Sequence, residues 1–222
     1  LCIYFFIMNA KTYNIIILDK SGSMSCVRKE TVDNVNEILG SIRSSQEKNA
    51  EVEQVVTLVA FCGCEIKTLI DAQPVSKVDN ISFKSYQPCC TTPLYDAIGM
   101  TITKLQKRII DEENAAVAVT VITDGYENSS HEYSRASIKA LIDAYKEKGW
   151  MFAYIGADHD VERVAFSLSI DNALRFEKTS GGMEKRQLCL CKAWGDWDEK
   201  MHDKDMTPEK RKECSKSFFD KF

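Results

Sequence analysis

Apolar runs alternate with amphipathic segments along most of the chain, and this alternation predicts an α/β fold. Runs rich in β-branched residues are typical of strands and occupy residues 13–18, 55–61, 65–70, 116–122, 150–155 and 173–176. Apolar positions at helical spacing lie between them, over residues 25–46, 94–109, 133–148 and 161–167. Strands that alternate with helices through short links favour a mostly parallel sheet covered by helices.

Two of these strands have further signatures. The runs 55–61 and 65–70 are separated only by Cys62-Gly63-Cys64, and so short a link predicts an antiparallel hairpin. The run 116–122 has almost no polar residue, which predicts a strand buried on both faces at the centre of the sheet. Before the second helix, we expect Thr92 to be the N-cap and Pro93 to be the first helical residue.

The composition suits one sizeable globular domain. The chain has 222 residues, of which 44% are hydrophobic and 28% charged, with a formal net charge of −4. This balance lacks the basic excess of a nucleic-acid-binding protein, and no apolar run reaches the length of about 18 residues that spans a bilayer. We therefore expect neither a nucleic-acid nor a membrane partner. An odd count of nine cysteines, with no secretion signal, predicts free thiols and a cytoplasmic location.

The predicted domain covers residues 13–182. Residues 1–12 are an N-terminal extension in which we expect Met8 to be the natural start, with a short extra strand as the alternative. Residues 183–222 form a C-terminal helical extension, where residues 184–191 suit one helix and Thr207-Pro208 opens another. Trp194 and Trp197 in this extension either anchor a partner or pack back on the domain, and the pattern leaves both open.

Two predicted strands end in a carboxylate, at Asp19 and at Asp124. In an open α/β sheet, ligands bind outside the carboxyl ends of the strands, where the strand order reverses. If the two strands are neighbours at that point, Ser21, Ser23 and Thr92 join the carboxylates in one crevice. Carboxylates and hydroxyls are hard oxygen donors that suit Mg²⁺ or Mn²⁺, with several waters retained, and suit zinc poorly. The alternative for residues 19–23 is a polar turn that caps the next helix.

Three short motifs resemble, in order and spacing, the three parts of the metal-ion-dependent adhesion site of von Willebrand factor type A domains. They are Asp19-x-Ser21-x-Ser23, the stretch Thr92-Pro93-Leu94-Tyr95-Asp96-Ala97, and Thr123-Asp124-Gly125. The similarity covers roughly residues 13–177 and is nearest to stand-alone intracellular bacterial members of the family. It implies a doubly wound, six-stranded sheet with one antiparallel edge strand and helices on both faces.

The resemblance also implies roles for the site residues. Ser21, Ser23 and Thr92 would contact the metal directly, while Asp19 and Asp124 would act largely through water. One departure is that Thr92 follows Cys89-Cys90-Thr91 where the family usually has small residues such as glycine. Thr91 is an alternative ligand, but the cap position and the Pro-Leu that follows favour Thr92.

Direct ligands that are neutral hydroxyls leave the ion most of its positive charge. We therefore predict a non-catalytic, metal-dependent module that captures an Asp or Glu of a protein partner, with no small-molecule substrate. Residues that follow the predicted strands at the same edge would form a partner-binding rim: Tyr126, Glu127, Asn128 and His159, with His131 as a further candidate. The alternatives are that residues 126–128 form a helix entry and that the histidines are ordinary solvated loop residues.

A metal-dependent enzyme of phosphoryl-transfer or hydrolytic type that uses Asp19 is the alternative function. The sequence disfavours it, because Ser21 occupies the place of the second aspartate in phosphatases of the haloacid dehalogenase type. Phosphate-binding Gly-rich loops and the Gly-x-Ser-x-Gly elbow are also missing from the sequence. A zinc site is a further alternative, suggested by the paired cysteines at 62 and 64, 89 and 90, and 189 and 191. These spacings are not the Cys-x₂-Cys pairs of common zinc sites, so they favour free cysteines.

Overall fold

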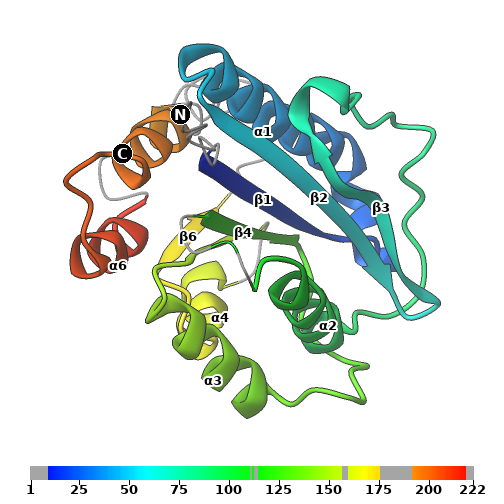
Figure 1. Cartoon of the computed structure of the whole chain (residues 1–222). Helices are drawn as coiled ribbons and strands as arrows, with labels where there is room; N and C mark the ends of the chain where they lie inside the picture. The colour runs from blue at the N-terminus through cyan, green and yellow to red at the C-terminus, as the bar shows by residue number, and fades with distance from the viewer. Residues whose placement is uncertain (1–9, 111, 113–114, 157–159, 176–191, 219–222) are drawn as a thin grey trace, which may run out of the picture.

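A six-stranded sheet forms the centre of the molecule, in the strand order β3-β2-β1-β4-β5-β6 (Figure 1). The computed structural model describes residues 10–110, 112, 115–156, 160–175 and 192–218. The strands are β1 (Ala10–Asp19), β2 (Val52–Cys62), β3 (Glu65–Pro74), β4 (Ala116–Thr123), β5 (Met151–Gly156) and β6 (Asn172–Arg175). Neighbouring strands are parallel except β2 and β3, which form the predicted antiparallel hairpin at the edge.

Helices cover both faces of the sheet, as predicted (Figure 1). The helices are α1 (Arg28–Lys48), α2 (Leu94–Arg108), α3 (Arg135–Lys146), α4 (Val161–Ser167), residues 192–201 and α6 (Pro208–Lys216), with short 3₁₀ helices at Gly22–Val27 and Val75–Lys77. Apolar residues of α1 and of the 192–201 helix share one core cluster with the sheet, and those of α2, α3 and α4 share the other. None of the described helices is long and apolar enough to cross a bilayer.

The strand order reverses between β1 and β4, which are parallel neighbours. Leu18 of β1 lies opposite Ile122 of β4, so Asp19 and Asp124 leave the sheet at the same edge. All eight residues of β4 are buried, which confirms that the run 116–122 is a central strand, and the last eight residues of β1 are buried as well. The fold therefore brings the two predicted carboxylates to one crevice.

The start of α2 differs from the prediction. The helix begins at Leu94, and the expected cap by Thr92 is wrong, because no cap side chain accepts a hydrogen bond there. The free N–H groups of Tyr95 and Asp96 donate instead to the side chains of Glu127 and Ser130, which come from the loop after β4. Tertiary contacts thus replace the local cap and leave the Thr92 hydroxyl available for another role.

The C-terminal extension packs on the domain. Residues 192–201 are helical, within the segment that was predicted as a helical extension, and their apolar positions at 194, 197 and 201 have helical spacing. Trp194 and Trp197 are 1% and 3% exposed and belong to the core cluster on the α1 side, so they do not form an exposed anchor for a partner. The helix predicted from Thr207-Pro208 is present, and Thr207 caps it through Lys210 N–H. The expected helix over residues 184–191 and the residues around Met8 lie outside the described residues.

Candidate metal site

Asp19 is a fully buried carboxylate at the end of β1. Its Oδ1 accepts the backbone N–H of Ser21 at 2.6 Å, and its Oδ2 accepts the hydroxyl of Thr123 at 2.6 Å. Burial raises the pKa of Asp19 to about 6, although the hydrogen bonds from Thr123 and Ser21 oppose the shift, and the charge of Asp124 adds to it. Among the described residues, no ion pair includes Asp19. A buried carboxylate in these surroundings would be stabilised by a bound cation.

A chain of hydrogen-bonded oxygens joins the loop after β1 to the loop after β4. Ser21 Oγ lies 3.1 Å from Ser23 Oγ, and Ser23 donates to Asp124 Oδ1 at 2.8 Å. Below them, the sulfur of the buried Met24 accepts the N–H of Asp124 at 3.2 Å. The two loops are therefore held together by polar contacts at the surface and by an apolar side chain underneath.

Gly125 marks the point at which the three motifs meet. A methyl group built on Gly125 would lie 3.3 Å from Ser23 Oγ, 3.4 Å from Thr92 Oγ1 and 3.7 Å from Asp19 Oδ2. Oxygen atoms from two motifs thus border a small space at Gly125 of the third motif, and glycine keeps that space open. We call the side-chain oxygens of Asp19, Ser21, Ser23, Thr92 and Asp124 the oxygen cluster.

Backbone contacts fix Thr92 in this position. Asn128 Oδ1 accepts the N–H of Thr92 at 2.8 Å, and Asn128 N–H donates to the carbonyl of Thr92 at 3.2 Å. Thr91 is exposed, and its hydroxyl lies against Gly63 in the β2–β3 turn, not in the oxygen cluster. Of the two threonines, Thr92 is therefore the one whose hydroxyl lies in the oxygen cluster.

The donor set fits a hard divalent cation. It contains two carboxylates and three hydroxyls, which are the ligand types that Mg²⁺ and Mn²⁺ prefer. Asp19, Ser21 and Thr92 are buried, whereas Ser23 is exposed and Asp124 is half-buried. The cluster is therefore accessible to solvent at Ser23 and Asp124.

The residues predicted for the rim have different positions. Tyr126 is 58% exposed beside Gly125. The carboxylate of Glu127 is engaged within the protein, because it accepts bonds from Tyr95, Ser129 and Ser130. Asn128 is exposed but holds Thr92, so it acts on the cluster through that residue. His159 lies outside the described residues.

Asp96 is a positioning residue to which the sequence motif gave no role. Its carboxylate is buried in α2 and accepts the backbone N–H groups of His131, Glu132 and Tyr133 at 2.8–2.9 Å. These bonds fasten the loop after β4 to the start of α2, and His131 itself is exposed. The signal was present in the sequence as the aspartate of the Thr-Pro-Leu-Tyr-Asp-Ala stretch.

Replacement of Asp19 by asparagine is expected to stabilise the metal-free protein. The pKa of Asp19 is raised to about 6 in the folded protein, so ionisation of Asp19 destabilises the fold. The free energy of unfolding is therefore highest below about pH 4, where Asp19 is protonated, and it falls as the pH rises through about 6. Asparagine avoids this cost of up to about 3 kcal/mol. Urea unfolding in EDTA should show the largest gain near pH 8 and little gain near pH 4. The control is Asp33→Asn, because Asp33 lies in an exposed pair with Lys29, and it should change stability by less than about 0.5 kcal/mol. A loss of stability in Asp19→Asn would contradict the burial argument.

Comparison with known proteins identifies the fold. At the level of sequence, no family model matches the chain, and neither does any curated protein. Among solved structures, it is similar to manganese-loaded Plasmodium vivax TRAP protein, with a TM-score of 0.59 and 17% identity over 84% of this chain and 74% of that one. It is also similar to the SpRpn10 VWA domain, with a TM-score of 0.53 and 11% identity over 76% and 89% of the two chains.

A third similar structure is the von Willebrand factor type A protein from Catenulispora acidiphila, with a TM-score of 0.52 and 15% identity. This match covers 86% of the present chain but only 43% of the Catenulispora chain, so the present chain spans less than half of that relative. The resemblance drawn from the three motifs is confirmed at the level of the fold. The chain has the von Willebrand factor type A fold.

Proposed function

We propose that this chain is a non-catalytic module that binds a protein partner through a divalent cation, Mg²⁺ or Mn²⁺. The residues that would hold the ion are those of the oxygen cluster: Asp19, Ser21, Ser23, Thr92 and Asp124. The observation that carries the proposal is that oxygens of Asp19, Ser23 and Thr92, from two distant motifs, meet at Gly125 of the third, where Ser23 also donates to Asp124. The solved TRAP protein of the same fold is manganese-loaded, which supports a divalent ion in a domain of this kind.

The chemistry of the cluster favours an acidic partner. Ser21, Ser23 and Thr92 offer neutral oxygens, so direct contacts with them cancel little of a cation's charge. A bound ion would supply a positive centre at the solvent side of the cluster, where an Asp or Glu of the partner can complete the coordination. Tyr126, exposed next to this opening, would contribute apolar contact area to the same partner.

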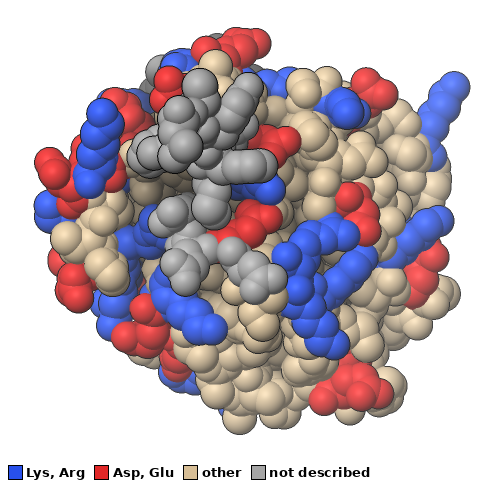
Figure 2. All heavy atoms as spheres, in the orientation of Figure 1, with Lys and Arg blue, Asp and Glu red and all other residues tan. Residues whose placement is uncertain are grey.

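A protein partner also agrees with the surface charge. Acidic and basic side chains are interspersed over the face shown in Figure 2, and the net charge of the chain is −4. Nucleic-acid-binding proteins instead gather basic residues on one face. The described cysteines are free thiols, which supports the proposed cytoplasmic location.

Catalysis by Asp19 has less support. An aspartyl nucleophile must reach its substrate, yet Asp19 is fully buried and both of its oxygens accept hydrogen bonds from the protein. Its surroundings suit a carboxylate that orients ligands around an ion.

Affinity capture from the native host tests the proposed function. We expect the immobilised chain to retain a partner in Mg²⁺, to release it in EDTA, and to fail to retain it when Asp19 is replaced by asparagine. Tyr126→Ala should weaken binding of the partner but not of the ion, because Tyr126 lies outside the oxygen cluster. A partner retained equally in EDTA and by Asp19→Asn would show that binding does not depend on the ion.

A further inference from the structure

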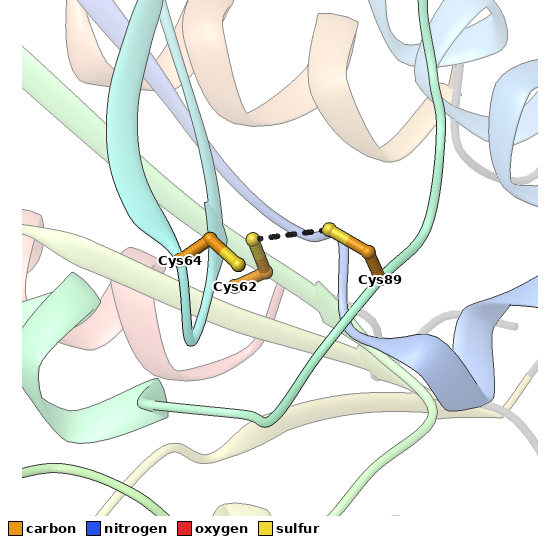
Figure 3. A group of neighbouring side chains, drawn as sticks. All are labelled: Cys62, Cys64 and Cys89. Atoms are coloured by element: carbon orange, nitrogen blue, oxygen red, sulfur yellow. Dashed lines mark hydrogen bonds between the residues drawn. The ribbon is translucent and has the colours of Figure 1, made fainter.

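Four cysteines gather beside the oxygen cluster, and we call Cys62, Cys64, Cys89 and Cys90 the cysteine cluster. Cys62 and Cys64 flank the β2–β3 turn, and the other two lie in the loop before Thr92. The sulfurs of Cys62, Cys64 and Cys89 all lie within 4.8 Å of one another and point toward a common centre (Figure 3). The separations are 3.6 Å for Cys62–Cys89 and 2.7 Å for Cys64–Cys90.

The backbone holds these two segments in close contact. Gly63 N–H donates to the carbonyl of Thr91 at 2.8 Å, and a methyl group on Gly63 would lie only 2.0 Å from Thr91 Oγ1. A side chain at position 63 would therefore force the hydroxyl of Thr91 to move. Cys90 adopts a left-handed conformation with φ 65°, which costs a residue other than glycine about 1–2 kcal/mol. This strain lies at one of the four cysteines of the cluster.

We propose that the cysteine cluster binds one Zn²⁺. Zinc bonds thiolate sulfurs at about 2.3 Å in a tetrahedron, which places the sulfurs about 3.8 Å apart. The Cys62–Cys89 separation is close to this value. The Cys64–Cys90 pair must open by about 1 Å, which its exposed side chains permit. The thiol protons pass to solvent on binding, and soft sulfur donors select zinc over the hard ion of the oxygen cluster.

Hydrogen bonds and the charge of Lys20 act on the thiols of the cysteine cluster. Burial opposes ionisation of the Cys62 thiol, but hydrogen bonds from the backbone of Cys64 and Glu65 and from Cys89, together with the charge of Lys20, lower its pKa overall. The neighbouring thiols raise the pKa values of Cys89 and Cys90, chiefly through the bonds with Cys62 and Cys64 respectively.

Zinc in this position would fix the loop that carries Thr92. Cys89 N–H donates to the carbonyl of Lys20 at 2.8 Å, and the carbonyl of Cys90 accepts the N–H of Gly22 at 2.9 Å. The zinc site would join the β2–β3 turn to the loop after β1 and to the loop that carries Thr92. Its own ligands are separate from that cluster, so zinc binding does not depend on the proposed Mg²⁺ site.

Metal analysis of the full chain, purified with a phosphine reductant and dialysed after addition of zinc, tests the inference. We expect one zinc per chain, and Co²⁺ in its place should give the intense near-ultraviolet absorption of cobalt–thiolate bonds. The double variant Cys64→Ser/Cys89→Ser should lose zinc affinity by at least about tenfold. It should still fold, because Cys64 is exposed and Cys89 is only half-buried.

Matched controls separate the cluster from the other cysteines. Cys26→Ser/Cys214→Ser should keep the zinc, as should the variant with serine at positions 2, 189 and 191. Asp19→Asn should also keep it, which distinguishes failure of this inference from failure of the proposed function. The inference would be overturned if Cys64→Ser/Cys89→Ser bound zinc as tightly as the wild type. It would also be overturned if the reduced wild type bound no zinc, or bound iron in its place.

Discussion

Replacement of Trp194 by alanine is expected to lower the free energy of unfolding by about 3–5 kcal/mol. Among the residues that the structure describes, Trp194 is the largest fully buried side chain, at 1% exposure, and it packs edge-on against Phe218 with ring centroids 5.1 Å apart. Alanine would leave a large cavity between the sheet and the 192–201 helix, and interiors of normal packing density collapse only partly around such a space. Chemical denaturation monitored by circular dichroism measures the effect.

A polar network adds to the cost of this substitution. The indole N–H donates to Asn14 Oδ1, and Asn14 in turn donates to Gln54 Oε1, both at 2.9 Å. Gln54 then donates to a carboxylate oxygen of the buried Asp198 on the 192–201 helix. Trp194→Phe should therefore cost about 1–3 kcal/mol, because it keeps most of the volume but leaves Asn14 without its donor.

An exposed aromatic residue provides the control. Phe166 in α4 is 83% exposed, so Phe166→Ala should change stability by less than about 0.5 kcal/mol. If Trp194→Ala were as mild as this control, the packing of the C-terminal extension on the sheet would be wrong.

Replacement of Gly125 by alanine is expected to weaken Mg²⁺ binding by at least about tenfold, since even changes outside the ligand shell cost 10–100-fold in metal affinity. The added methyl group would contact the oxygens of Ser23, Thr92 and Asp19 in the space that an ion and its waters require. The backbone of Gly125 does not need glycine for its conformation, because its φ is not in the left-handed region. The fold should therefore tolerate the substitution.

Thermal stabilisation by Mg²⁺ measures this loss. At a concentration about 100-fold above the dissociation constant, a bound ion stabilises the native state by about 2.7 kcal/mol, and tenfold weaker binding reduces this to about 1.4 kcal/mol. Gly40→Ala is the matched control: a methyl group there meets nothing within 4 Å, and alanine in α1 should add up to about 1 kcal/mol of stability. An unchanged Mg²⁺ response in Gly125→Ala would mean that the ion binds elsewhere.

The parts of the fold that depend on local pattern could be predicted from the sequence. The apolar runs that form β1 and β4 indicate buried strands, and the short link at Cys62-Gly63-Cys64 predicts a hairpin. The meeting of Asp19 and Asp124 followed from the rule that parallel strands end at one edge of the sheet. Periodicity and topology were sufficient for these features.

Contacts between distant segments could not be predicted in this way. The missing cap of α2 is supplied by Glu127 and Ser130 from a loop more than thirty residues away along the chain. The cysteine cluster likewise could not be predicted. Its pairs lack the local spacing of common zinc motifs, and they lie on two segments that meet only in the fold. The domain boundary at residues 182 and 183, the start at Met8 and the role of His159 stay predictions.

Calorimetric titration of the wild-type chain and of Asp19→Asn with Mg²⁺ tests the central claim most directly. Five oxygen-bearing side chains that converge on one small space should bind one ion per wild-type chain, and Asp19→Asn should bind it at least about tenfold more weakly. Equal affinity in the two proteins, or no binding to the wild type, would contradict the account.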